Sequence, residues 1–325
     1  MAKRKARVVQ SVELVRVQPA APAAVDRLAR LVSDFLAQYK PTTQQAYRGD
    51  LERFRRWSGA PSVQAATELL LSGGLGAAND VVLRYRAHLL ETVTAKSCNR
   101  SVSAIKSVVK LARKLGLVVW TLEVSDLKTQ QYRDTRGPGE DGYRLMVGEL
   151  TGRADAGERV AVRDLAMVRL LFERGLRRGE AVGLDLAHVD LAAPSVSILG
   201  KGRDQREALT VNRATLDALT RWVAVRGSDP GPLFVRLDRG GSESERLTGA
   251  AVWKMVRKVG AAVGIKTRPH GLRHGGITAV LDRNGGNMRA GLAFSRHVRS
   301  DTLRLYDDNR ADLGGQMAAL LDGIA

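Results

Sequence analysis

The chain has little cysteine and little histidine: one cysteine, Cys98, and five histidines in 325 residues. A single cysteine excludes an intrachain disulfide and is typical of a protein of the reducing cytoplasm. No apolar run approaches the roughly 18 residues of a membrane span, and no apolar region follows the basic residues 1–7, so we expect neither a membrane segment nor a signal peptide.

Two patterns of cofactor chemistry are also missing. No cysteine–histidine cluster has the spacing of zinc ligands, and no glycine-rich loop of the Walker type is present. We therefore expect chemistry that needs no ATP, no other cofactor and no metal site.

Acidic residues are the minority among the charges. The 34 Asp and Glu stand against 52 Lys and Arg, which gives a net charge of +18. This excess predicts a polyanionic partner, with nucleic acid the leading candidate and an anionic membrane surface the weaker one. The length and the 44% hydrophobic content are those of an ordinary globular protein with two compact domains.

The histidines that are present gather near the C-terminus. His270, His274 and His297 share one segment with Arg273 and Tyr306. These residue types suit phosphodiester chemistry without a metal, because arginine neutralises phosphate oxygens, imidazole moves protons and a tyrosine oxygen can be the nucleophile. Taken alone, the segment fits equally well a pair of amphipathic helices with histidines in their core.

Two further motifs lie upstream. Residues 175–180 read GLRRGE and close an apolar run, and residues 200–203 read GKGR between two β-rich runs. In this order, over residues 28–325, the motifs resemble the tyrosine recombinase (phage integrase-type) family. The resemblance implies a mainly α protein with a small antiparallel β-sheet, made of an N-terminal helical SAM-like core-binding domain and an α+β catalytic domain.

The resemblance divides the chain into four parts. We expect a flexible basic arm over 1–25, a core-binding domain that clamps DNA over 26–118, a linker over 119–140 and a catalytic domain over 141–325. In the family, a C-terminal helix links protomers cyclically; here an apolar stripe at Met317, Leu320, Leu321 and Ile324 marks that helix. Folding of this helix back onto its own domain is the alternative.

In the first domain, apolar spacing predicts a helix from residue 28 that Pro41 ends, and a second that Thr42 and Gln45 cap. Further helices are predicted over about 80–91 and 95–115, and the last has a basic face that we interpret as facing DNA rather than only solvent. Its first residues could hold a phosphate with free backbone N–H groups. The candidate DNA contacts of the whole chain are Lys40, Thr42, Thr43, Thr94, Lys96, Ser97, Asn99, Arg100, Lys106, Arg136 and Arg203.

In the second domain, a helix ending before Gly175 places Arg177 at a rigid helix end. Short runs at 189–191, 196–199 and 208–211 predict an antiparallel sheet whose hairpin turn, 200–205, carries Lys201 at its tip. His188 is assigned to strand packing. Helices are predicted over about 214–225, 249–263 and 270–281.

The resemblance also implies the catalytic roles. Tyr306 would attack a DNA phosphate to give a 3′-phosphotyrosine and a free 5′-hydroxyl, and the partners would be double-stranded DNA at a specific site and a homotetramer formed on it through a Holliday junction. Arg177 and Arg273 would clamp the phosphate, His297 would donate a hydrogen bond to it, and His274 would be a buttress. Lys201 would give a proton to the leaving 5′-oxygen and His270 would take or relay the tyrosine proton, and which of these two acts as base or acid stays open. Glu180 would hold Arg177 or a neighbouring helix cap.

Two departures from the family pattern stand out. Residues 295–297 read Ser-Arg-His, so that Arg296 replaces a common glycine, and the pair Gly275 and Gly276 interrupts a predicted helix where helix propensity is poor. A type IB topoisomerase-like enzyme and a non-catalytic DNA-binding protein of the same fold are the competing interpretations. The target sequence, accessory DNA-binding factors and the choice among integration, excision, resolution and inversion stay open. Such a protein is expected in the cytoplasm, associated with the nucleoid.

Overall fold

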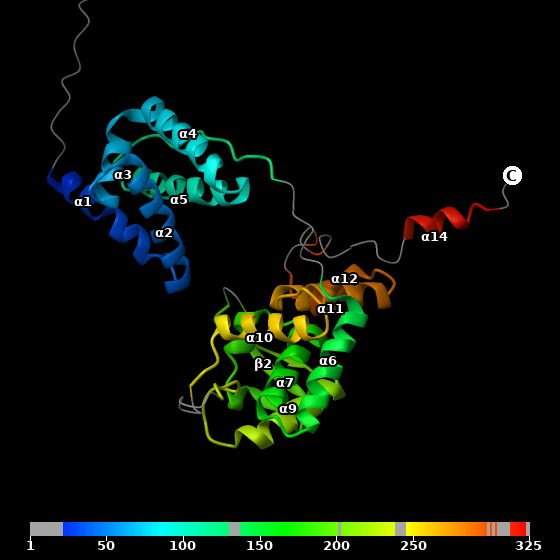
Figure 1. Ribbon diagram of the computed structural model, residues 1–325. Coiled ribbons are helices and arrows are strands. Elements are labelled where there is room, and N and C mark those ends of the chain that lie inside the picture. Colours follow the sequence, from blue (N-terminus) through cyan, green and yellow to red (C-terminus); the bar gives the residue numbers. More distant parts are fainter. Residues whose placement is uncertain are drawn as a thin grey trace, which may run out of the picture. The chain divides into compact units, whose positions relative to one another are not determined.

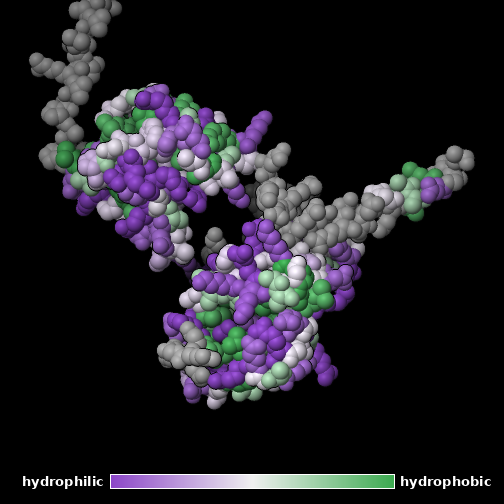
Figure 2. Space-filling view, viewed as in Figure 1, coloured by the Kyte–Doolittle hydropathy of each residue, from purple (hydrophilic) through white to green (hydrophobic). Residues whose placement is uncertain are grey.

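The computed structural model describes residues 22–129, 137–200, 203–237, 245–297, 300, 303 and 313–322. The chain divides into two compact units, Met1–Gln131 and Tyr132–Ala325 (Figure 1). Each unit has its own hydrophobic core, and hydrophilic side chains predominate on the visible face of each (Figure 2). No helix in the described ranges is both long enough and apolar enough to cross a bilayer.

Residues 22–129 of the first unit form a bundle of five helices. Its core holds Leu31, Phe54, Tyr85 and Ile105, one from each of four helices, and all four are almost fully buried. The helices are α1 (Pro22–Ala37), α2 (Pro41–Ser58), α3 (Val63–Ser72), α4 (Gly74–Thr92) and α5 (Ala95–Lys114).

The starts of two of these helices differ from the sequence prediction. Pro41 does not merely end α1; it is the first residue of α2, a position that suits proline because its missing N–H has no partner there in any helix. The capping box predicted at Thr42 and Gln45 was therefore wrong, and Lys40 occupies the cap without a side-chain hydrogen bond. Helix α4 begins at Gly74 rather than near Asp80, since Gly73 and Gly74 separate two helices that follow each other directly.

Residues 117–127 complete the core of the first unit. Val124 is 4% exposed, and Leu117, Trp120 and Leu127 pack against the same cluster. The Asn99 side chain holds this segment by donating to the Leu127 carbonyl and accepting from its N–H, both at 2.9 Å. Part of the stretch assigned to a linker is thus packed onto the helices of the first unit.

The second unit is built around one central helix, α7, which packs on its neighbours α6, α9 and α11. Eleven of its fifteen residues are buried, in keeping with an apolar run that continues on all sides. The helices in the described part of this unit are α6 (Gly139–Asp155), α7 (Arg159–Glu173), α8 (Arg178–Val182), α9 (Arg213–Arg226), α10 (Gly249–Ala262), α11 (Pro269–Arg283), α12 (Met288–Ser295) and α14 (Leu313–Ala319).

The predicted small sheet is confirmed. Strands β1 (Val189–Asp190), β2 (Ser195–Leu199) and β3 (Arg206–Thr210) pair antiparallel in sequence order, with Val196 opposite both Val189 and Leu209. His188, which was assigned to strand packing, ends the short 3-10 helix η1 (Leu186–His188) directly before β1. There its Nδ1 accepts from the Asp185 N–H at 2.8 Å.

The glycine pair of α11 permits close packing of two helices. A Cβ on Gly276 would lie 2.0 Å from the Phe172 carbonyl oxygen of α7, and one on Gly275 would lie 3.0 Å from the Phe172 ring. Poor helix propensity is therefore accepted at these positions because α11, which carries His270 and Arg273, must lie directly against the end of α7.

Candidate active site

Four of the predicted catalytic residues line one pocket of about 460 Å³. Arg177 comes from the turn after α7, His270 and Arg273 from the first turns of α11, and His297 from the segment after α12. Three elements far apart in sequence thus converge on a concave, cationic surface. A pocket of this kind suits an anionic group such as a phosphate.

Arg177 is held by Glu180, one helical turn on. The Glu180 carboxylate accepts from the Arg177 backbone N–H at 2.8 Å and from its guanidinium at 2.7 Å. This caps α8 and fixes the direction of the guanidinium at the same time. Burial opposes the charged form of Glu180, but the Arg177 N–H and the charge of Arg296 outweigh it and lower the pKa of Glu180. Glu180 thus contacts both the backbone and the side chain of Arg177, and its part in catalysis stays a prediction.

Arg273 is 1% exposed and connects the other parts of the pocket. Its guanidinium donates to the carbonyls of Gly175 and Ser295, the latter at 2.5 Å. It also lies 3.2 Å from Nε2 of His297. One buried arginine therefore joins the turn that carries Arg177 to the turn that carries His297.

The two pocket histidines favour the neutral form. Burial and the charges of Arg273, Arg177 and Arg296 lower the pKa of His297 to about 4. His270 lies at the mouth of the pocket, where desolvation of its ring, together with the charge of Arg273, lowers its pKa as well. A neutral imidazole can accept a proton, and it can donate one hydrogen bond.

His274 is separate from the pocket lining. It is 3% exposed, and its Nδ1 lies 3.4 Å from the Thr278 hydroxyl of the next turn. It lies within the packed face of α11, and the buttressing role expected for it stays a prediction.

The described residues exclude three of the predicted ones. Lys201, Arg136 and Tyr306 lie outside the described ranges, so their roles stay predictions. Arg203, which follows Lys201, donates to Glu207 at 2.6 Å within the β2–β3 hairpin.

The chain was compared with known proteins. The Phage integrase family matches residues 147–312. The chain is 36% identical to a tyrosine recombinase of Synechocystis sp. over 247 residues, which cover 74% of this chain and 77% of the relative. It is also 36% identical to a tyrosine recombinase of Synechococcus elongatus over 285 residues, covering 85% and 87%.

The chain belongs to the phage integrase family of tyrosine recombinases.

Solved structures show the same fold. The Tn1549 transposon integrase in complex with transposon right-end DNA matches with a TM-score of 0.66 and 15% identity, over 90% of this chain and 99% of that one. A lambda integrase dimer bound to a core site matches with a TM-score of 0.64 and 14% identity, over 89% and 95%. The predicted family, fold class and recombinase activity are thus confirmed.

The candidate DNA contacts of this recombinase's first unit fall into two groups. Lys40, Thr42, Thr43 and Lys96 are exposed. The others make contacts within the unit: Arg100 binds Asp50 through two hydrogen bonds, Lys106 pairs with Asp126, Asn99 holds residue 127, and Thr94 caps α5 through the Ser97 N–H. At Ser97 the cap occupies one of the backbone N–H groups proposed for a phosphate. Their contact with DNA stays a prediction.

Sequence reasoning missed several residues at the pocket. Arg178, Trp253 and Arg268 line it, and Trp253 is 38% exposed beneath the Arg257 guanidinium, 4.6 Å from the ring centre. Arg178 and Arg268 adjoin recognised motifs, so their basic character was a usable signal. Trp253 gave none, because α10 only comes beside α8 and α11 in the folded unit.

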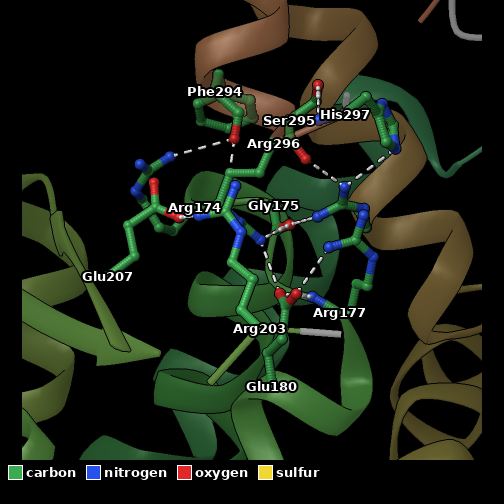
Figure 3. A network of polar contacts seen from close by, with 11 residues as sticks. Arg174, Gly175, Arg177, Glu180, Arg203, Glu207, Phe294, Ser295, Arg296 and His297 are labelled. Carbon is green, nitrogen blue, oxygen red and sulfur yellow. Dashed lines mark hydrogen bonds and ion pairs between the residues drawn. The ribbon is translucent and has the colours of Figure 1, made fainter. Parts of the chain in front are cut away.

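Arg296 is the least expected residue of the site. It has φ +57°, and it is the one non-glycine residue with positive φ among those described. This left-handed conformation ends α12 and costs about 1–2 kcal/mol for a residue with a Cβ. The conformation explains why glycine is common at this position in the family. The Arg296 side chain is 5% exposed and pairs with Glu180 at 2.7 Å (Figure 3).

Proposed function

We propose that this recombinase cuts and rejoins DNA at a specific site through a 3′-phosphotyrosine formed by Tyr306, without ATP or a metal. The observation that carries the proposal is the convergence of Arg177, Arg273, His270 and His297 on one cationic pocket. These groups come from three separate elements, and their joint use for one phosphate explains their placement better than packing does.

The pocket chemistry follows from charge. As the tyrosine oxygen attacks phosphorus, negative charge grows on the non-bridging oxygens, and the guanidiniums of Arg177 and Arg273 would stabilise it. His297 would donate a hydrogen bond to the same oxygens. His270, neutral because of its surroundings, would take the phenol proton, and Lys201 would give a proton to the leaving 5′-oxygen.

The bond energy remains in the phosphotyrosine, so a 5′-hydroxyl of another strand can reverse the step. Exchange between two duplexes would then use four protomers on DNA and a Holliday junction. The relatives of known structure include a lambda integrase dimer bound to a core site. The net charge of +18 supports DNA as the partner.

The test begins with a DNA site. Fragments bound by the purified protein are selected from a pool of random-sequence duplexes and sequenced. A site recovered in this way is then nicked beside the cleavage position, so that cleavage cannot be reversed. Wild type is expected to form a denaturant-resistant protein–DNA adduct, whereas Tyr306→Phe binds the DNA and forms none. An equal adduct yield from both proteins would refute the catalytic assignment.

The rival of a topoisomerase-like enzyme gives a different product. A protein of that kind relaxes supercoiled plasmid as a monomer and yields no recombinant molecules. Plasmids that carry two copies of the selected site distinguish the two, because recombination changes the order of flanking restriction fragments and relaxation does not.

A further inference from the structure

Two turns carry Arg177 and His297 of the pocket. The first turn, residues 174–177, follows α7 and holds Arg177. The second, residues 294–297, follows α12 and holds His297. Both contain a residue in the left-handed conformation, Gly175 with φ +59° and Arg296 with φ +57°. The apolar faces of α7 and α12 do not by themselves determine how far apart these two turns lie.

The Arg296 side chain spans the gap between the turns. Its Nη1 donates to the carbonyls of Arg174 at 3.3 Å and Phe294 at 3.4 Å. Its Nη2 donates to the Gly175 carbonyl at 3.2 Å and to Glu180 at 2.7 Å. Figure 3 shows the Arg296 and Arg177 guanidiniums meeting the Glu180 carboxylate from two sides.

Gly175 receives bonds from two arginines. Its carbonyl accepts from Arg273 on the pocket side and from Arg296 on the other. Phe294 closes the contact, because its ring lies 3.1 Å from where a Cβ of Gly175 would be and under the Arg174 guanidinium, 5.3 Å from the ring centre. Arg296 itself does not line the pocket.

We propose that Arg296 is a positioning residue: its buried guanidinium fixes Glu180 and the Gly175 turn, and thereby holds Arg177 in register with Arg273 and His297. The proposal rests on the phosphodiester chemistry proposed above. Arg296 touches neither the substrate nor the reacting atoms, and it acts through Glu180 and the backbone of the first turn.

Stability alone does not account for an arginine at this position. Glycine would adopt the left-handed conformation without strain, and a buried ion pair recovers little more than the cost of removing both charges from water. A fixed direction for Arg177 is a gain that a glycine cannot supply. Misplacement of a catalytic group by a fraction of an ångström lowers the rate, which gives this rigidity a use.

The variant Arg296→Gly removes the guanidinium and keeps the backbone conformation. The readouts are the single-turnover rate of adduct formation on the nicked site at saturating protein, and the Kd for the same DNA with Tyr306→Phe as background. We expect the rate to fall about 10–100-fold with the Kd little changed, as for loss of a residue that supports a reactive group. Arg296→Lys, which keeps a charge for Glu180 but cannot bind three carbonyls together, should recover part of the rate.

Arg289→Ala is the matched control, because it removes an exposed arginine of the same helix, α12. Its rate should equal that of wild type. The proposal would be overturned if Arg296→Gly folds and forms the adduct at the wild-type rate. It would also be overturned if the variant binds DNA more weakly but reacts at an unchanged rate. If Arg296→Gly does not fold, as judged by its thermal unfolding, Arg296→Lys carries the same test: a rate equal to wild type would overturn it.

A double variant tests the route through Glu180. If Arg296 acts by fixing Glu180, then Glu180→Gln combined with Arg296→Gly should be little slower than the slower single variant. If the rate loss of the double variant equals the product of the two single rate losses, Arg296 and Glu180 act independently, and the proposal is contradicted. Failure of wild type to form any adduct would instead refute the proposed function, and with it this role, so the two failures are distinguishable.

Discussion

At the scale of single residues, the described part of the site has several cationic side chains around the buried carboxylate of Glu180. Glu180 is 4% exposed in its side chain and meets Arg177 and Arg296, while Arg273 donates to the carbonyls of Gly175 and Ser295 and lies beside His297. Among the described residues, these groups carry more positive than negative charge, which suits the binding of a phosphate. Burial lowers the pKa values of the two pocket histidines, and the neighbouring guanidiniums lower them further, because each opposes another positive charge.

His297 should therefore make folding sensitive to acid. Its pKa is about 4 in the folded protein, against 6.5 for the free group, so between these values the unfolded chain binds a proton that the folded chain does not. This contribution to stability is complete above about pH 6.5 and is lost as the pH falls towards 4. Thermal unfolding at about pH 7 and about pH 5 should show a larger loss of Tm for wild type than for His297→Asn.

An equal or larger loss of Tm in His297→Asn would contradict this assignment of the pKa. Inorganic phosphate gives a second measurement. If the anion occupies the pocket, it supplies the missing negative charge, raises the pKa of His297 and reduces the difference between the two proteins.

At the scale of elements, α7 and the helices on it set the position of the pocket. Glu173, the last residue of α7, accepts from the Tyr143 hydroxyl of α6 and from the Thr215 hydroxyl of α9, each at 2.6 Å. The Tyr143 ring also stacks on Phe172 with centroids 3.8 Å apart. Since the chain turns towards Arg177 immediately afterwards, these contacts place the first turn of the pocket.

The contact between α11 and α7 gives a sharp test of this packing. Gly276→Ala should destabilise the second unit by about 1–3 kcal/mol despite the better helix propensity of alanine, because its Cβ would meet the Phe172 carbonyl. Gly148→Ala is the matched control: Gly148 is exposed within α6 and has nothing within 4 Å of its would-be Cβ. That change should stabilise by about 0.5–1 kcal/mol.

Denaturant unfolding of both variants measures the difference. Similar stabilities for Gly276→Ala and Gly148→Ala would show that the two helices can separate without cost, and that close packing does not explain the glycine pair.

At the scale of the whole molecule, the dominant property is the charge of +18. It acts over both units, since each carries exposed basic residues such as Lys96 and Lys110 on α5 and Lys258 on α10. Binding of a polyanion by such a surface releases counterions, so affinity should depend steeply on salt.

If about 6–10 phosphates are neutralised, DNA affinity should fall by about 10³–10⁵ between about 50 and 200 mM salt. Lys110→Gln, on the exposed side of α5, should reduce the slope of log K against log salt by about 1 if this helix faces DNA. Titration of labelled duplex at several salt concentrations measures both. An unchanged slope would show that Lys110 faces only solvent.

The sequence by itself determined the family, the fold class and the assignment as a recombinase. Helices α5, α7, α9 and α10 and the three-stranded sheet were predicted close to their observed bounds, because apolar spacing and glycine positions are local signals. The four motif residues of the pocket were also named from their order along the chain. Helix starts at Pro41 and Gly74 were predicted wrongly, since capping depends on which residues fold into the neighbouring turn.

Only the tertiary structure decided what the departures from the family pattern mean. Arg296 looked like a replaced glycine in the sequence, and its binding of Glu180, Gly175 and Phe294 depends on residues up to 121 positions away. The same holds for Gly276 against Phe172, and for Asn99, whose amide holds the backbone of Leu127 rather than facing outwards. Local patterns specify helices and motifs. The partner of a buried side chain depends on how the elements pack together, and the spacing of residues along the chain does not show this packing.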